Sequence, residues 1–371
     1  MLIYNARLYT MHGGIIDGGW IRFENGLIAG IGEPDTCPAP DGGDTDAAGA
    51  PVTPGLIDAH CHIGLMEDSQ SFEDTDDANE WSEPITPHLR ALDAVNPLDR
   101  MFSEALRGGV TAVCSGPGSL NPIGGRAVAL KTYGRRVDDM VLSEPAALKI
   151  AFGENPRLRG KKDKPPHTRM GAAALIREAF FTAIEYRDGR GAFDMVSESL
   201  LPVLSCELRV HAHAHRACDI FTALRIGAEF GFRPVIIHAT ESETAADLLG
   251  GVSVITGPSF GTRSKPELRS LSCKTPGALS AAGLKPCICT DAPELPIDSL
   301  ALMAAIAVRD GMRPYEALRA ITWYPAVTLG IEGRAGALKP GLDADAVLWN
   351  TDPLDAGARP DAVFVSGVRR A

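Results

Sequence analysis

The chain has 371 residues, of which 45% are hydrophobic and 22% charged, a balance typical of a globular protein with one large core and a smaller module. Its net charge of −11 argues against nucleic-acid and anionic-membrane partners, because both require a basic surface. No segment approaches the roughly 20 apolar residues of a membrane span. Residues 1–5 lack the basic and apolar regions of a signal peptide, so we expect a cytoplasmic protein. The 8 cysteines show no zinc-finger spacing and are expected to be small buried side chains.

Both ends of the chain are predicted to be β-structure, with a turn at residues 24–26. The expected strands are Leu2–Tyr9, Trp20–Phe23, Leu27–Ile31, Ala346–Trp349 and Ala362–Val365. We expect these strands to form one small composite β-sandwich domain from residues 1–51 and 333–371.

The middle of the chain alternates short apolar strands with helical patterns, which is typical of parallel α/β architecture. The eight expected strands are Ile57–His60, Ala112–Ser115, Ala127–Lys131, Ala147–Ala151, Leu208–His213, Val235–His238, Val252–Thr256 and Pro286–Asp291. Helical patterns fit between most of them, at Pro97–Gly108, Gly171–Arg187, Ile220–Phe230, Thr244–Leu249 and Thr275–Ala282. Eight strands with intervening helices predict a (β/α)8 TIM-type barrel over residues 52–332, with a doubly wound open sheet as the alternative. The long polar segment 64–96 is expected to form a wall or lid of the active site.

The most informative stretch is the first barrel strand, which follows Pro54-Gly55 and ends in His60-Cys61-His62. Side chains two residues apart on a strand point the same way, so both imidazoles face one side and Cys61 faces the other. Two neutral imidazoles on one face are half of a transition-metal site.

Other barrel strands also carry polar residues at or near their ends. Lys149 lies in the fourth strand, His211, His213 and His215 follow one another on one face of the fifth, His238 ends the sixth and Asp291 ends the eighth. Because catalysis in such barrels occurs where strands end, we expect these side chains to meet at one rim. Each has a structural alternative, such as a core histidine for His238 or a helix N-cap for Asp291.

This order of residues resembles that of the amidohydrolase superfamily. The segments Pro54 to His62 and Gly336 to Val347 are similar to the opening and closing motifs of that superfamily. The chain most resembles the imidazolonepropionase-related branch, which includes metal-dependent dipeptidases with a carboxylated lysine. True imidazolonepropionases lack this lysine, so Lys149 argues against that activity.

The resemblance implies a metal centre with two divalent ions. His60 and His62 would hold one ion and His213 and His238 the other, while carboxylated Lys149 and a hydroxide bridge them. Asp291 would contact the first ion and act as the catalytic acid and base. Zinc fits this ligand set, and so do manganese, iron and cobalt.

Several assignments stay open. Lys131 also ends an apolar strand and is the alternative to Lys149, while His211 and His215 are the alternatives to His213. His215 is otherwise expected to face the substrate. Four cations on strand-end loops are candidates to bind a substrate carboxylate, namely Arg169, Arg216, Arg263 and Lys265.

Together these features predict a metal-dependent hydrolase that cleaves a C–N bond, an amide, in a small molecule. A deaminase of the same superfamily with one ion, and a metal-binding barrel without catalysis, are the two alternatives. A homo-oligomer is compatible with the sequence, which identifies neither the substrate nor the subunit number.

Overall fold

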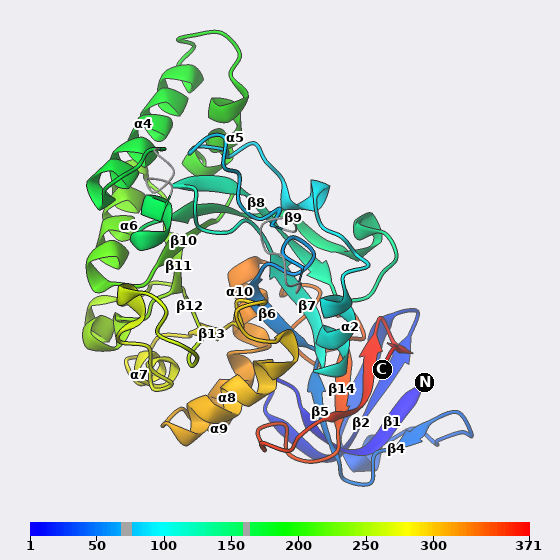
Figure 1. Cartoon of the computed structure of the whole chain (residues 1–371). Helices are drawn as coiled ribbons and strands as arrows, with labels where there is room; N and C mark the ends of the chain where they lie inside the picture. Colours follow the sequence, from blue (N-terminus) through cyan, green and yellow to red (C-terminus); the bar gives the residue numbers. More distant parts are fainter. Residues whose placement is uncertain (68–75, 159–163) are drawn as a thin grey trace.

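The computed structural model describes residues 1–67, 76–158 and 164–371, and two eight-stranded sheets organise these residues (Figure 1). The first sheet combines both ends of the chain in the order β16-β15-β14-β5-β1-β2-β3, with β4 beside β1. Its strands are β1 (Leu2–Tyr9), β2 (Ile15–Glu24), β3 (Leu27–Gly32), β4 (Thr45–Asp46), β5 (Pro51–Pro54), β14 (Ala346–Trp349), β15 (Pro360–Val365) and β16 (Val368–Arg369).

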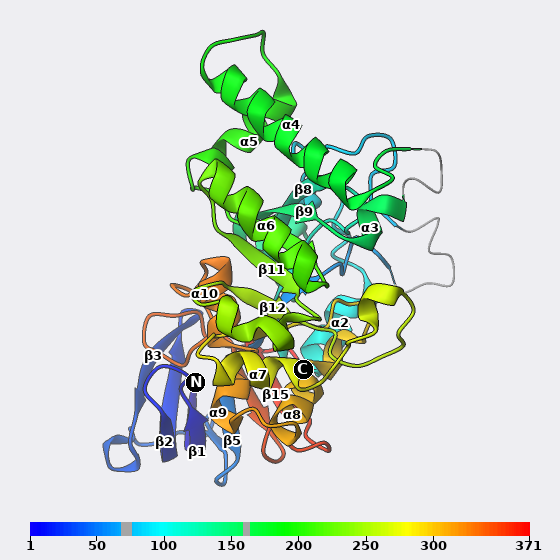
Figure 2. The same ribbon diagram turned by 90° about the vertical axis from the view of Figure 1, so that its left-hand side faces the viewer.

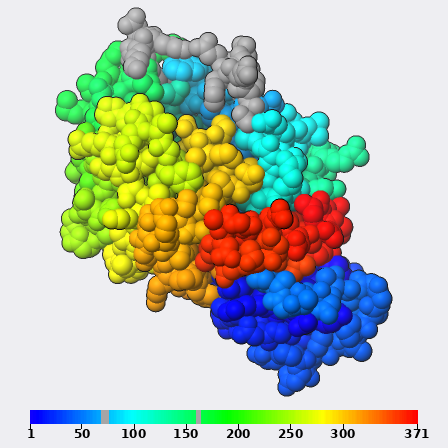
Figure 3. Space-filling view, turned by 60° about the horizontal axis from the view of Figure 1, so that its bottom comes forward, coloured from blue at the N-terminus to red at the C-terminus, as the bar shows by residue number. Residues whose placement is uncertain are grey.

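The pairing of β14 with β5 joins the two chain ends, as predicted from their strand-rich sequences. The space-filling view places the C-terminal segment between the N-terminal strands and the rest of the molecule (Figure 3). The strands among the described residues of this region form one sheet, and the predicted β-sandwich is not confirmed. The division into domains at residues 51 and 333 stays a prediction.

The second sheet holds the predicted barrel strands in chain order, from β6 to β13. They are β6 (Leu56–Cys61), β7 (Val110–Ser115), β8 (Ile123–Lys131), β9 (Val141–Ala151), β10 (Val210–Ala214), β11 (Pro234–His238), β12 (Val254–Thr256) and β13 (Cys287–Ile288). Two hydrogen bonds connect the edge strands β6 and β13 near their C-terminal ends. The amide of His62 donates to the carbonyl of Ala292, and the amide of Thr290 donates to the Asp58 carboxylate. The result is a nearly closed barrel.

One strand departs from the prediction of eight parallel strands. β8 runs antiparallel to both β7 and β9, whereas the other neighbours in this sheet are parallel. A parallel connection needs a crossover of a dozen or more residues, and the connection at residues 116–122 is too short for one. The barrel is therefore mostly parallel, with the C-terminal end of β8 at the opposite rim from the ends of its neighbours.

Helices cover the outside of the barrel. Among the described residues they include α2 (Arg100–Arg107), α4 (Arg169–Arg187), α5 (Met195–Leu204), α6 (Ala217–Phe230), α7 (Thr275–Ala281), α8 (Leu300–Arg309), α9 (Pro314–Arg319) and α10 (Trp323–Leu329). Figure 2 shows α6 along β11, with α4 further out. The predicted helix at 244–249 is instead part of an irregular 3₁₀ segment, Ser242–Leu248. In the described part of the chain, no helix combines the length and apolar character that crossing a membrane requires.

Candidate metal centre

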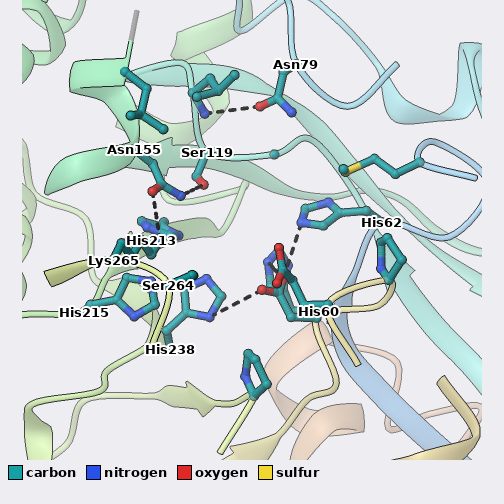
Figure 4. A pocket seen from close by; sticks show the side chains of 18 of the residues that line it. His60, His62, Asn79, Ser119, Asn155, His213, His215, His238, Ser264 and Lys265 are labelled. Atoms are coloured by element: carbon teal, nitrogen blue, oxygen red, sulfur yellow. Dashed lines mark hydrogen bonds and ion pairs between the residues drawn. The ribbon is translucent and has the colours of Figure 1, made fainter. Parts of the chain in front are cut away.

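Two groups of buried side chains meet at the carboxyl ends of the parallel barrel strands (Figure 4). In the first group, Asp291 Oδ1 lies 3.2 Å from His60 Nε2 and 3.4 Å from His62 Nε2. Lys149 Nζ lies 3.1 Å from the same His60 nitrogen. The structure thus brings together His60, His62, Asp291 and Lys149 of β9.

The second group consists of His213 and His215 on or just after β10 and His238 at the end of β11. One ring nitrogen of each lies within 4.8 Å of the others, and His238 also belongs to a group with His60 and Asp291. His238 therefore joins the two groups into one site. His213 and His215 both face this site, so the sequence-based preference for His213 alone is not resolved by geometry.

Hydrogen bonds from the surrounding backbone and side chains orient several of the imidazoles. Nδ1 of His62 bonds to the carbonyl of Gly116, and Nδ1 of His238 to that of Gly257, each at 2.7 Å. Nδ1 of His215 lies 2.7 Å from the hydroxyl of Thr240. A carbonyl accepts a hydrogen bond from Nδ1–H, and in the neutral ring this leaves the lone pair on Nε2 free to bind a metal.

The backbone at the strand ends is unusual at two of these residues. His238 has a φ of 71° and Asp291 a φ of 57°, the left-handed region that residues other than glycine seldom adopt. Such conformations persist only where surrounding contacts enforce them, and they concentrate at functional sites. Here they turn an imidazole and a carboxylate toward the same point.

Burial sets the protonation of the site. It lowers the pKa of His238 to about 4 and holds those of His60, His213 and His215 well below the usual value, so these rings are neutral near pH 7. Burial also lowers the pKa of Lys149 to about 8, although Asp291 opposes this shift.

The Asp291 carboxyl behaves differently from the histidines. Burial would raise its pKa, but the neighbouring imidazoles of His238, His60 and His62 hold the pKa well below its usual range. The carboxylate is therefore ionised.

The donor set fits a divalent transition metal. Neutral imidazole nitrogens and an ionised carboxylate are the ligands that zinc and its neighbours prefer. Both ring nitrogens of His213 are buried and have no hydrogen-bond partner among the described residues. A buried polar atom without a partner is costly, and a bound ion would remove that cost.

Lys131, the alternative bridging lysine, is not part of this site. Because β8 is antiparallel, Lys131 lies at the opposite end of the barrel, 2.7 Å from Asp343 and 3.1 Å from Asp345. His211 pairs with Lys149 in the β9–β10 register and does not line the cavity at the site.

The three arginines predicted to bind substrate engage other protein groups. Arg169 Nε bonds to Asp219 at 3.0 Å, and Arg216 Nε lies 3.8 Å from Glu241. Arg263 donates to the backbone carbonyls of residues 269 and 271. None of the three lines the cavity, whereas His215 does. Their role in substrate binding stays a prediction.

The cavity has a volume of about 310 Å³ and contains residues that the sequence analysis did not select. Ser119, Asn155 and Lys265 line it, and Lys265 is the only one of these that the sequence analysis considered. Glu267 lies behind this wall, fully buried, with Oε1 3.9 Å from His213 Nε2 and 3.7 Å from His215 Nε2. Ser119 and Lys265 lie in loops, Asn155 lies in the one-turn helix α3 (Glu154–Arg157) and Glu267 in a 3₁₀ turn, and no periodic pattern marks them.

Part of the predicted wall in segment 64–96 is also present. Met66 and Asn79 line the cavity, while residues 68–75 of that segment lie outside the described residues.

Comparisons with known proteins agree with this geometry. The family model described as "Amidohydrolase family" matches residues 208–369. The crystal structure of an amidohydrolase from Thermotoga maritima MSB8 is 36% identical, covers 99% of this chain and 98% of that chain, and superposes with a TM-score of 0.94.

Two curated relatives carry more specific names. Amidohydrolase tasK from Hapsidospora irregularis is 32% identical over 359 residues, which are 87% of this chain but 36% of that protein. The chain thus spans about a third of the length of tasK. Imidazolonepropionase from Paracoccus denitrificans (strain Pd 1222) is 27% identical over 388 residues, covering 94% of this chain and 93% of that enzyme.

An α/β barrel with histidines and an aspartate at its strand ends is of the hydrolase type. The chain belongs to the amidohydrolase family. It is an enzyme that acts on carbon–nitrogen bonds.

Proposed function

We propose that this enzyme is a metal-dependent hydrolase of an amide bond in a small molecule. The observation that carries the proposal is the meeting of two groups of potential ligands at His238, beside the buried Lys149 and Asp291. His60, His62 and Asp291 would hold one divalent ion, and His213 and His238 a second. We propose zinc as the resident ion, with manganese, iron and cobalt as the alternatives.

Lys149 is proposed to bridge the ions as a carbamate. Its ammonium lies 3.1 Å from His60 Nε2, where it would repel a cation on that nitrogen. The ammonium first loses one proton. Addition of CO2 to the resulting neutral amine then forms an N–C bond and releases a second proton, so that a cation is replaced by an anion with two oxygen donors. This carbamate is also what the similarity to the branch with carboxylated lysine implies, and it argues against imidazolonepropionase activity.

Divalent ions at this site would lower the pKa of a bound water and polarise the scissile carbonyl. Asp291 is the group placed to move protons. Its ionised carboxylate, oriented by His60 and His62, accepts a proton as water adds to the carbonyl carbon and returns it to the departing nitrogen. Hydrolysis then yields a carboxylic acid and an amine.

The experiment measures metal content and turnover together. The purified enzyme is tested on dipeptides, N-acyl amino acids and lactams, with elemental analysis of each preparation. Lys149→Ala should reduce bound metal from two equivalents toward one, and bicarbonate or a short carboxylate should restore part of it.

Asp291→Asn separates proton transfer from metal binding. This variant should keep much of the metal and lose about 10²–10⁴-fold in turnover, the usual contribution of general acid–base catalysis. Asp310→Asn, a change at a partly exposed aspartate that does not line the cavity, is the matched control. Equal turnover by Asp291→Asn and the wild type would overturn the mechanism. Deamination of a ring amine by an enzyme with one ion would favour the deaminase instead.

A further inference from the structure

One wall of the cavity is built from hydrogen-bond donors that are already fixed in place. Ser119 and Lys265 lie in loops and Asn155 in helix α3, and all three line the same cavity as the histidines (Figure 4). Asn155 Nδ2 donates to Ser119 Oγ at 2.7 Å, and Lys265 Nζ donates to Asn155 Oδ1 at 2.8 Å. The three side chains therefore form one connected chain, which we call the donor wall.

The bonds within the donor wall leave donors rather than acceptors to face the cavity. An ammonium carries three N–H groups, and those of Lys265 have Asn155 and Glu267 as partners, the latter at 3.0 Å. One N–H remains. Because the Ser119 oxygen accepts from Asn155, the hydroxyl hydrogen of Ser119 also remains to donate.

Glu267 explains why a lysine side chain is held in this place. This carboxylate is 0% exposed, and its Oε2 accepts the backbone amide of Glu154 at 2.9 Å. A free lysine side chain loses considerable rotamer entropy when it becomes ordered. Because Glu267 and Asn155 already hold Lys265 in one position, this entropy is not lost again when a ligand binds. The Lys265 side chain still has 26% of its surface exposed, so a ligand in the cavity can reach it.

Two residues of the donor wall, Asn155 and Lys265, also border a second cavity. Asn155, Leu158, Ser264 and Lys265 line both the metal-site cavity and an adjoining cavity of about 470 Å³. A molecule that places its amide at the histidines and extends toward the second cavity would therefore lie along residues that include Lys265.

We propose that Lys265 and Ser119 bind a free carboxylate of the substrate, so that the enzyme prefers amides carrying an acidic group. This inference rests on the proposed amide hydrolysis and adds the class of substrate. An ammonium and a hydroxyl that both have a donor to spare match the two oxygens of a carboxylate, and hydrogen bonds between charged partners are about twice as strong as neutral ones. An uncharged carboxamide in the same place would lose the charge pairing and bring N–H groups against donors.

The test compares N-acetyl amino acids and dipeptides with the same compounds converted to C-terminal carboxamides. We expect the wild type to have a higher kcat/KM for the carboxylates. Lys265→Met should lower kcat/KM for the carboxylates by about 10- to 100-fold, the usual effect of losing a hydrogen bond to a charged group, and should lower it less for the carboxamides, so that the preference for carboxylates is lost. Ser119→Ala, which keeps the pair between Lys265 and Glu267, should lower it by about 3- to 10-fold. Lys285→Met, at an exposed lysine away from the cavity, is the matched control.

Binding of the same compounds to metal-depleted protein, followed by ligand-observed NMR, separates this inference from the proposed hydrolysis. Binding of the carboxylates that is lost in Lys265→Met and Ser119→Ala supports the inference even if the enzyme cleaves none of these amides, an outcome that would refute only the proposed function. If the wild type binds and cleaves carboxylates and carboxamides equally well, or if both variants keep the preference, the inference is wrong while the proposed hydrolysis stands.

Discussion

Lys131 offers a sharp test of how the barrel is attached to the sheet formed by the chain ends. It ends β8 with its side chain 8% exposed, and Nζ contacts Asp343 at 2.7 Å, Asp345 at 3.1 Å and the hydroxyl of Ser366 at 2.9 Å. These three partners lie in the C-terminal part of the chain. Replacing Lys131 with methionine keeps most of the side-chain volume and removes the charge.

The expected loss of stability in Lys131→Met follows from the burial of the aspartates that Lys131 contacts. Asp345 is 4% exposed, and burial raises its pKa even though attraction to Lys131 lowers it. Without Lys131 the carboxylate is buried with no cation bonded to it. Removing one partner of a buried ion pair costs about 3–5 kcal/mol, so we expect Lys131→Met to lower the free energy of unfolding by about that amount at pH 7.

The pH dependence gives a second signature. Loss of Lys131 raises the folded-state pKa of Asp345 further above its unfolded value of about 3.9, so protonation favours the folded state. The stability that the folded variant gains from protonated Asp345 is fully present below the pKa that Asp345 has in the unfolded state. It is lost as the pH rises through the pKa that Asp345 has in the folded state. The difference between the wild type and the variant should therefore be largest at neutral pH and shrink as the pH falls toward 4.

The assay is urea unfolding followed by circular dichroism between pH 4 and 8. Arg334→Ala is the control, because Arg334 also pairs with Asp343, at 2.8 Å, but its side chain is 46% exposed and should contribute less than about 1 kcal/mol. Lys131→Met with Asp345→Asn should recover part of the loss. A loss no larger than that of Arg334→Ala, or one that does not depend on pH, would refute the reasoning.

Three further predictions concern the site and are tested by calorimetry, elemental analysis and turnover. Asp58→Asn should lower the melting temperature and the turnover. The Asp58 carboxylate accepts hydrogen bonds from both the amide and the hydroxyl of Thr290, and so holds β6 beside the residue that precedes Asp291. Unchanged turnover would show that this contact is dispensable. Gly257→Ala should reduce the amount of bound metal. Gly257 has a φ of 136°, and a Cβ there would lie 2.1 Å from a backbone oxygen, so the substitution should displace the Gly257 carbonyl that orients His238. Full metal content in this variant would contradict the prediction. Removing metal with a chelator should lower the melting temperature and adding zinc should restore it, because an ion that binds only the folded state stabilises that state; no shift would argue against a bound ion.

The strands of the barrel could be predicted from the sequence because they are buried on both faces. Their expected bounds differ from the observed ones by a few residues at most for β6, β7, β10 and β11, each a short apolar run. The metal-centre candidates followed from these strands, since polar residues at the ends of such runs are unusual unless they serve a site. His60, His62 and Asp291 were found in this way.

The donor wall could not be predicted in the same manner. Ser119 lies in a loop, and Asn155 and Glu267 lie in single helical turns, which are too short for a period of 2 or of 3.6 to mark the residues that face inward. Their roles depend on which loops meet in space, and the loops on the catalytic rim meet only because the barrel nearly closes. Lys265 was considered only because it is a cation after the seventh strand, and nothing in the sequence indicated that Glu267 would hold it.

The direction of β8 links the topology to the choice of lysine. Apolar composition gives the same pattern for a strand running either way, so Lys131 and Lys149 both read as lysines at the end of a buried strand. The connection at residues 116–122 is the feature that distinguishes them, because it can form a hairpin-like return but not a crossover. Reversal of β8 sends Lys131 to the rim that faces Asp343 and Asp345, where its charge is neutralised, while Lys149 on the next strand points to His60. The same short connection thus places Lys131 where it contributes to stability and leaves Lys149 at the metal centre. Lengthening this connection should therefore disturb both the attachment of the C-terminal segment and the metal content. Lys131→Met should disturb the attachment alone.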